Sequence, residues 1–366
     1  MVLDRREFKL GYWKILIKNG LLFDGYKFCE KKDIYISGGK IENIADDISE
    51  RADMVFDATG KIVLPGMIDI HTHILGISDD GIGTPADSGC FPFGVTAVGD
   101  GCSEFGFIEA LNAIKTKVFA FVPVWVKNGI PDFKTTEKLI EKFSDRVVGI
   151  KAYFDVNVSK ESTIYTLKEI CNFATSKNLS VMVHCSNSVT PMADIVEVLS
   201  KGDILTHIYH GGNNTCIDDN YLAFNLAKEK EVILDTGFAG HIHTDFNVLV
   251  KAMTDGCYPD TISTDLTNLS TYYRGGNYGL TLCMSLCRKY GMREEDVLKA
   301  VTSNAAKALG KNELGTIKIG SNADISVINY ENLPFDFTSL TKNGVKGDKQ
   351  YKCYLTLSDG QIVWRR

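Results

Sequence analysis

The sequence predicts an α/β protein: a (β/α)8 barrel of parallel strands, with a small β module formed by both ends of the chain. Two observations predict this class. Apolar, β-branched segments alternate with helix-like segments through the middle of the chain. Both ends instead contain short apolar runs broken by Gly, Asn and Asp turns. Strands that are almost continuously apolar are typical of a parallel sheet covered on both faces, and eight βα units favour a closed barrel.

The elements of the predicted barrel follow one another in regular order. The eight strand candidates are 62–70, 94–98, 118–126, 147–150, 180–183, 203–206, 231–235 and 261–264. Helix-like segments between them include TEKLIEKF, STIYTLKEICNFATSKN, PMADIVEVLSKG, DDNYLAFNLAKEK and DFNVLVKAMTDG. We therefore expect a barrel domain over 62–311. Segments 1–61 and 312–366 both consist of short predicted strands separated by turns, so we expect them to form one composite module.

Composition narrows the function class. The formal net charge of −6 argues against nucleic acid or an anionic membrane as a partner. No apolar run approaches the roughly 20 residues that span a bilayer, and the first residues lack the apolar core of a secretory signal. Ten cysteines occur without CxxC spacing, which favours reduced thiols. We expect a cytoplasmic protein that acts on a small molecule.

The stretch LPGMIDIHTHI, at positions 64–74, carries two histidines near the end of the first barrel strand. Alternate residues of a strand point to the same face, so His71 and His73 project together. A buried strand seldom carries two imidazoles on one face unless something binds them. Neutral imidazole is the commonest metal ligand among side chains, so the pair indicates a metal site.

Other polar residues also fall at predicted strand ends. Lys151, His184, His207 and Asp265 follow later strands, and the chain's histidines all lie at or just after such ends: 71, 73, 184, 207, 210, 241 and 243. Taken singly, each residue can be explained without a metal. A histidine can be hydrogen-bonded to its neighbours, an aspartate can lie in a turn or cap a helix, and a lysine can extend its amine to solvent. Together, in barrel register, they predict one metal site at the carboxyl ends of the strands.

Lys151 needs a chemical reason to belong to a metal site, because an ammonium repels cations. Burial lowers the pKa of lysine and frees the neutral amine. The amine can take up CO2 to form a carbamate, whose two oxygens can bridge two divalent ions and compensate their charge. The alternative is a lysine that binds a substrate carboxylate.

The ordered motifs VLPGMIDIHTH, GVTAVGD, VVGIKAYF, VMVHC, DILTH, STDL and VTSNAAKALG…LGTIKIGSNADISVIN resemble the amidohydrolase superfamily. They cover nearly the whole chain. Within the superfamily, the sequence is most similar to the amidohydrolase/deacetylase, dihydroorotase-like group. The resemblance implies a TIM barrel with a composite β-sandwich made from both chain ends.

The resemblance also implies roles for individual residues. His71 and His73 would bind a first metal with Asp265, and His184 and His207 a second; the metal is expected to be zinc. The carbamate of Lys151 would bridge the two ions, with a hydroxide between them that attacks the carbonyl carbon. Asp265 would act as general base and then general acid.

Four further residues are candidates near the substrate. His241 matches the family's GH segment and would hold a substrate carbonyl or carboxylate. Arg274, in TNLSTYYRGGNYG, would pair with a carboxylate, or is a solvated loop residue. His210 either lines the pocket or replaces His207 as a ligand. Cys102 is either a small residue of a βα loop or a bridging ligand like that of some D-aminoacylases.

The resemblance therefore predicts a hydrolase that cleaves an N-acyl or cyclic amide bond, with possible esterase activity. One alternative is a mononuclear deaminase of the same superfamily, which does not need Lys151. Another is a barrel that has lost its metal and serves as a scaffold, although all six expected donors are present here. A phosphate-binding barrel isomerase would leave the histidines unexplained. A homo-oligomer is expected by resemblance alone.

Overall fold

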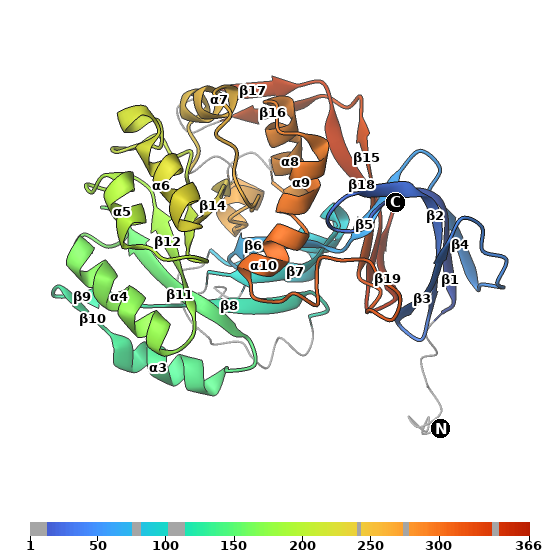
Figure 1. The fold of residues 1–366 in the computed structure, drawn as a ribbon, viewed down its shortest axis with the longest axis horizontal. Coiled ribbons are helices and arrows are strands. Elements are labelled where there is room, and N and C mark those ends of the chain that lie inside the picture. The colour runs from blue at the N-terminus through green and yellow to red at the C-terminus, as the bar shows by residue number, and fades with distance from the viewer. Residues whose placement is uncertain (1–12, 75–81, 102–113, 240–242, 274–277, 339–343) are drawn as a thin grey trace.

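The structure is a computed structural model that describes residues 13–74, 82–101, 114–239, 243–273, 278–338 and 344–366. Figure 1 shows two regions side by side. One is a curled sheet surrounded by helices, and the other is a sheet of long strands that contains segments from both ends of the chain.

The curled sheet has seven strands, and every neighbouring pair is parallel. In spatial order they are β6 (Met67–Thr72), β7 (Val95–Asp100), β8 (Lys117–Pro123), β11 (Val147–Phe154), β12 (Ser180–Cys185), β13 (Ile204–Thr206) and β14 (Ile233–Asp235). Most of their residues are buried, as expected for strands covered on both faces. The predicted α/β class is therefore confirmed, with a curled parallel sheet at its centre.

The predicted eighth strand, 261–264, is not an extended strand. Two isolated parallel bridges represent it: Thr261 pairs with Asp235 of β14, and Leu266 pairs with Thr72 of β6. The segment 261–266 thus contacts both edge strands of the sheet. Asp265 has a φ of +48°, in the left-handed region, which interrupts regular strand pairing at this point.

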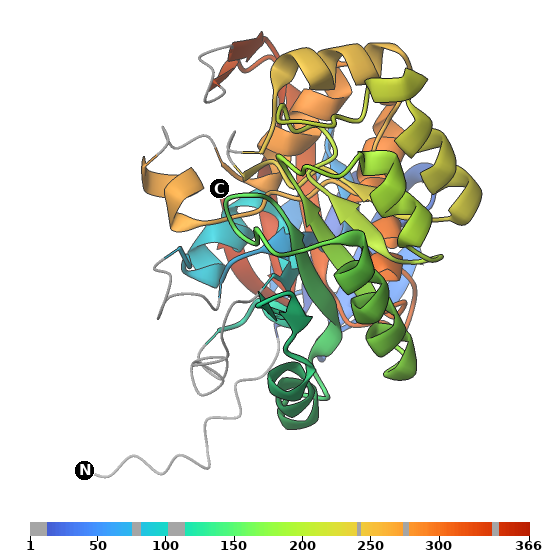
Figure 2. The same cartoon turned by 90° about the vertical axis from the view of Figure 1, so that its left-hand side faces the viewer.

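Helices cover the outer side of the curled sheet (Figures 1 and 2). They are α1 (Ala86–Cys90), α3 (Phe133–Lys142), α4 (Ile164–Ser176), α5 (Met192–Val198), α6 (Leu222–Lys230), α7 (Phe246–Thr254), α8 (Leu280–Lys289), α9 (Glu294–Ala300) and α10 (Ser303–Ala308). Side-chain caps set several helix starts. Asp132 accepts the Thr135 N–H before α3, and Asp245 accepts the Val248 N–H before α7.

Strands from both chain ends share the second sheet. Its order is β19 (Gln361–Arg365), β18 (Gln350–Ser358), β15 (Ile325–Glu331), β5 (Ile62–Pro65), β1 (Ile15–Phe23), β2 (Phe28–Ser37) and β3 (Lys40–Ala45), with β4 (Met54–Asp57) paired to β1. Because β15 pairs with β5, the two ends form one continuous sheet.

The predicted single strand 62–70 is in fact two strands that belong to different sheets. The chain changes sheet at Gly66, where an added Cβ would lie 2.3 Å from Oγ1 of Thr96. Residues 62–65 therefore pair with the terminal strands, although the predicted domain boundary placed them in the barrel. An apolar run gave no sign of this change of partner.

Two short antiparallel pairs lie outside the two large sheets: β9 (Val126–Lys127) with β10 (Ile130–Pro131), and β16 (Phe335–Thr338) with β17 (Gly344–Gly347). Within the described ranges, no helix is both long enough and apolar enough to cross a membrane. The cysteines of the described residues are free thiols.

Candidate metal centre

The six predicted donor residues lie together at the carboxyl end of the curled sheet. His71 lies in β6 and His73 directly after it. Lys151 lies inside β11, with three strand residues after it, and His184 lies near the end of β12. His207 follows β13, and Asp265 lies in the segment that bridges β14 and β6. Parallel strands bring these positions to one edge, where barrel enzymes carry their chemistry.

A first group of donors surrounds the carboxylate of Asp265. One donor atom each of His71, His207 and Asp265 lies within 4.8 Å of the others. Oδ1 of Asp265 is 3.4 Å from Nε2 of His71 and 3.0 Å from Nε2 of His73. A tetrahedral zinc ion with bonds of about 2.1 Å holds its ligand atoms about 3.4 Å apart. The spacing in this group therefore fits such an ion.

A hydrogen-bond chain fixes the orientation of His71. Its Nδ1 lies 3.0 Å from Oγ1 of Thr206, and that hydroxyl donates to Oδ2 of Asp235 over 2.7 Å. The hydroxyl oxygen is then available to accept the Nδ1–H of His71. Asp235 also accepts hydrogen bonds from Thr261 and Ser263, so its carboxylate is held firmly. This arrangement leaves the Nε2 lone pair of His71 facing the centre.

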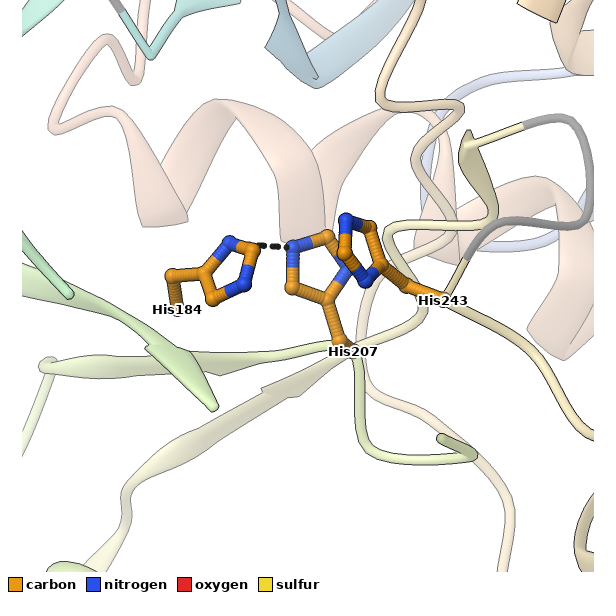
Figure 3. Close-up of side chains that lie close together, drawn as sticks. All are labelled: His184, His207 and His243. Atoms are coloured by element: carbon orange, nitrogen blue, oxygen red, sulfur yellow. Dashed lines mark hydrogen bonds between the residues drawn. The ribbon is translucent and has the colours of Figure 1, made fainter. Parts of the chain in front are cut away.

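A second group consists of His184, His207 and His243 (Figure 3). His207 donates its Nδ1–H to the carbonyl oxygen of Gly237 over 2.7 Å, so its Nε2 presents a lone pair. That lone pair faces Nδ1 of His184 at 3.0 Å. On the other side of the His184 ring, Nε2 lies 3.5 Å from Oδ2 of Asp155, which favours a proton on Nε2.

The donor atoms of both groups fit a cation. In the second group, Nδ1 of His184 and Nε2 of His207 lie 3.0 Å apart, at hydrogen-bonding distance. In the first, the Nε2 lone pair of His71 faces a carboxylate oxygen of Asp265. Nζ of Lys151 also lies 2.7 Å from that Nε2. Nitrogen and carboxylate donors at these spacings are the set that zinc prefers.

Burial sets the charge state of the centre. It lowers the pKa of His71 and His207 well below the usual range, and that of His243 to about 3. Burial acts to raise the pKa of Asp265, but His71 and His73 beside it hold that pKa well below its usual range. Neutral imidazoles and an ionised carboxylate are the forms that bind metal.

Lys151 is fully buried within this cluster. Burial lowers the pKa of its amine to about 8, although nearby carboxylates, Asp265 first among them, act to raise it. Nζ lies 2.7 Å from Nε2 of His71 and 3.3 Å from Sδ of Met182. About a tenth of the lysine is therefore neutral at pH 7, and this free amine is the form that takes up CO2.

Left-handed backbone recurs at the donors. His207 has a φ of +65° and Asp265 a φ of +48°. Neighbouring Gly237 has a φ of +49°, and a Cβ there would lie 2.5 Å from Nδ1 of His207. Non-glycine residues in this region cost about 1–3 kcal/mol each and concentrate at functional sites. The fold holds these two side chains in place despite that cost.

The remaining candidates fall in different places. His210 is buried and belongs to neither group; its Nδ1 accepts backbone N–H groups from Asn187 and Gly212. Burial lowers its pKa to about 4. His241, Arg274 and Cys102 lie outside the described residues.

Sequence reasoning assigned no role to His243, which the structure places in the second group. Its ring centroid lies 4.3 Å from that of His207 and 4.8 Å from that of His184. The signal was present, because His241 and His243 repeat the HxH spacing of the first strand. The described residues directly after β14, 236–239, are not in a strand, however, so that spacing did not imply a shared face.

Comparison with known proteins gives a family and several relatives. The family model described as Amidohydrolase family matches residues 62–363. A protein of Enterococcus faecalis named Deacetylase is 27% identical, over 96% of this chain and 99% of its own length. A 5'-deoxyadenosine deaminase of Methanobrevibacter smithii is 25% identical, over 95% of this chain and 92% of its own. A crystal structure of a dihydroorotase superposes with a TM-score of 0.85 at 23% identity, covering 95% of this chain and 98% of that one.

Proposed function

This chain belongs to the amidohydrolase family, and from that premise we propose that it is a metal-dependent hydrolase that cleaves the C–N bond of a small N-acyl or cyclic amide. The observation that carries the proposal is the convergence of buried nitrogen and carboxylate donors: His71, His184, His207 and Asp265. Similarity to a protein named Deacetylase supports the N-acyl class.

In this proposal, two divalent ions, expected to be zinc, occupy the centre. His71, His73 and Asp265 would hold the first, and His184 and His207 the second. When bound, the ions would polarise the amide carbonyl and lower the pKa of a water molecule. The spacing of the donor atoms supports this assignment.

Lys151 would supply the bridging anion. Its neutral amine attacks the carbon of CO2 and loses one proton, which gives a carbamate with two oxygens. Complete burial and a pKa of about 8 support this chemistry, because both keep part of the lysine as free amine.

Asp265 would carry the proton during the reaction. Its ionised carboxylate accepts a proton from the attacking water and passes it to the nitrogen as the C–N bond breaks. Oδ1 faces His71 and His73, whereas Oδ2 lies 4.0 Å from Nε2 of His243. Burial acts to raise the pKa of Asp265, but the contacts of Oδ1 with His71 and His73 hold that pKa well below its usual range.

Other expectations remain part of the proposal. His210, His241 and Arg274 would contact a small-molecule substrate. The segment 261–266 would complete a (β/α)8 barrel over 62–311, and the terminal sheet would form a composite β-sandwich from 1–61 and 312–366. A homo-oligomer in the cytoplasm is expected from the resemblance and composition.

A mononuclear deaminase is the second candidate. Two observations favour it: the first group forms without Lys151, and a 5'-deoxyadenosine deaminase is among the similar proteins. A metal-free scaffold would give no reason for the convergence of these donors.

An activity screen distinguishes these candidates. Purified protein, loaded with zinc and bicarbonate, is assayed with N-acetyl amino acids, dihydropyrimidines, hydantoins and adenine nucleosides. We expect hydrolysis of a member of the first three classes, abolished by a chelator and restored by zinc. Ammonia release from nucleosides alone would favour the deaminase, and no turnover of any class would contradict the proposal.

A further inference from the structure

The second group contains one more histidine than the proposed mechanism uses. Building on the proposed function, we propose that His184, His207 and His243 together hold the second ion, so that its binding does not require carboxylation of Lys151. His243 thereby becomes a third protein ligand.

The three rings lie close together (Figure 3). They come from three elements: β12, the turn after β13, and the segment before α7. The ring centroids of His184 and His207 are 4.4 Å apart, and that of His243 lies 4.3 Å from His207 and 4.8 Å from His184. One nitrogen of each ring lies within 4.8 Å of the other two. Small side-chain rotations bring these atoms to the roughly 3.4 Å spacing of a tetrahedral ion.

The second nitrogen of each ring already faces a polar partner. Nε2 of His184 faces Asp155, and Nδ1 of His207 donates to the Gly237 carbonyl. Nδ1 of His243 lies 2.9 Å from Oγ of Ser186. With that oxygen accepting, Nε2 of His243 is left with its lone pair. Metal-bound histidines typically have such a partner on the ring nitrogen that does not bind the metal.

Among the described residues, Ser186 is the only one that shares a hydrogen bond with His243. Its Nε2 lies 4.0 Å from the nearest oxygen of Asp265, beyond hydrogen-bonding distance. Three imidazoles whose ring nitrogens converge in this way are a donor set suited to a divalent cation. Three histidines with an open fourth position also form a known type of catalytic zinc site. A carboxylated lysine would then add a bridging anion to an ion that is already held.

Zinc content per chain tests this inference. Wild type, His243→Ala, His243→Asn, Lys151→Ala and the control His210→Ala are dialysed against buffered zinc, with and without bicarbonate. His210 is the matched control because it is buried and belongs to neither group. We expect two ions in wild type, in Lys151→Ala without bicarbonate, and in the control. Both His243 variants should bind the second ion at least about tenfold more weakly.

Cobalt substitution gives an independent readout. The visible absorption of Co²⁺ bound to wild type should change in His243→Asn and stay unchanged in His210→Ala, with thermal melting confirming that each variant is folded. If both His243 variants bind two ions with unchanged affinity and spectrum, the inference is wrong and the proposed function stands. A lower kcat/KM with unchanged zinc binding would assign His243 to the substrate instead. If Lys151→Ala loses the second ion, the independence from carboxylation is wrong. Absence of zinc from wild type would overturn the proposed function and this inference together.

Discussion

The two donor groups differ in the charge of their side chains and in the secondary structure that carries them. Both groups include His207; the first also contains His71, His73 and the carboxylate of Asp265, and the buried strand β6 carries or adjoins His71 and His73. The second consists of neutral imidazoles, and two of its members, His207 and His243, follow strands rather than lying in them. An anionic group on a rigid strand should bind a divalent ion more tightly than a neutral group on loops. The comparison suggests one centre with two metal sites of different affinity, a tighter one on the strand and a weaker one on the loops.

Asp265 should give the largest effect, because it belongs to the first group and is the proposed proton carrier. We expect Asp265→Asn to lower kcat/KM by about 10³-fold, within the usual range for a general acid–base residue. The same substitution should lower the affinity of the centre for the first metal ion. Steady-state kinetics and zinc content measure both quantities. An active variant that keeps its zinc would remove Asp265 from both roles.

Substitution of Lys151 tests its proposed role as the bridging anion separately from metal binding. Lys151→Ala should lower kcat/KM by about 10²-fold, since the anion between the two ions is lost. Kinetics in bicarbonate-containing and CO2-depleted buffer provide the readout, and bicarbonate should raise the activity of wild type only. Undiminished activity of the variant would favour the mononuclear deaminase.

Asp155 should affect metal binding by the second group alone. Its carboxylate lies beside Nε2 of His184, so Asp155→Asn should lower the affinity for the second ion by about 10–100-fold and leave the affinity for the first ion unchanged. Zinc titration with a competing chelator measures both affinities. The control is Asp145→Asn, whose carboxylate is 80% exposed and contacts no donor residue of the centre. Equal weakening of both ions would contradict the separation of the two groups.

Asp69 should give the smallest effect, on the pH dependence of stability. Its carboxylate ties β6 to the segment of Asp265 by accepting the N–H and hydroxyl of Thr264, and burial raises its pKa to about 7. A raised carboxyl pKa means that the folded state binds the proton more strongly. The stabilisation from this proton is therefore present below about pH 4 and is lost as the pH rises towards 7.

Urea unfolding of metal-free protein at pH 5 and pH 7 tests this prediction. Each unit of pKa difference corresponds to about 1.4 kcal/mol. Wild type should lose more stability than Asp69→Asn between the two pH values, since the variant lacks the titrating group. Identical pH slopes would show that Asp69 does not titrate in this range.

The strand ends and the HxH pair were predictable because strand periodicity and apolar runs are local properties. The amidohydrolase resemblance, an amidohydrolase enzyme and the α/β class are confirmed. The change of sheet at Gly66 was not predictable, because an apolar run does not specify its pairing partner. The role of His243 was also missed, since only the tertiary path after β14 brings it beside His207. Similarly, the left-handed turn at Asp265 replaces a predicted strand by two bridges.

The most direct test of the two-group account is the number of metal ions per chain in protein purified without chelator, measured by elemental mass spectrometry. The account predicts about two zinc-like ions per chain. About one ion would favour the mononuclear deaminase. No ion, even after addition of zinc and bicarbonate, would contradict the assignment of His71, His184, His207 and Asp265 as metal ligands.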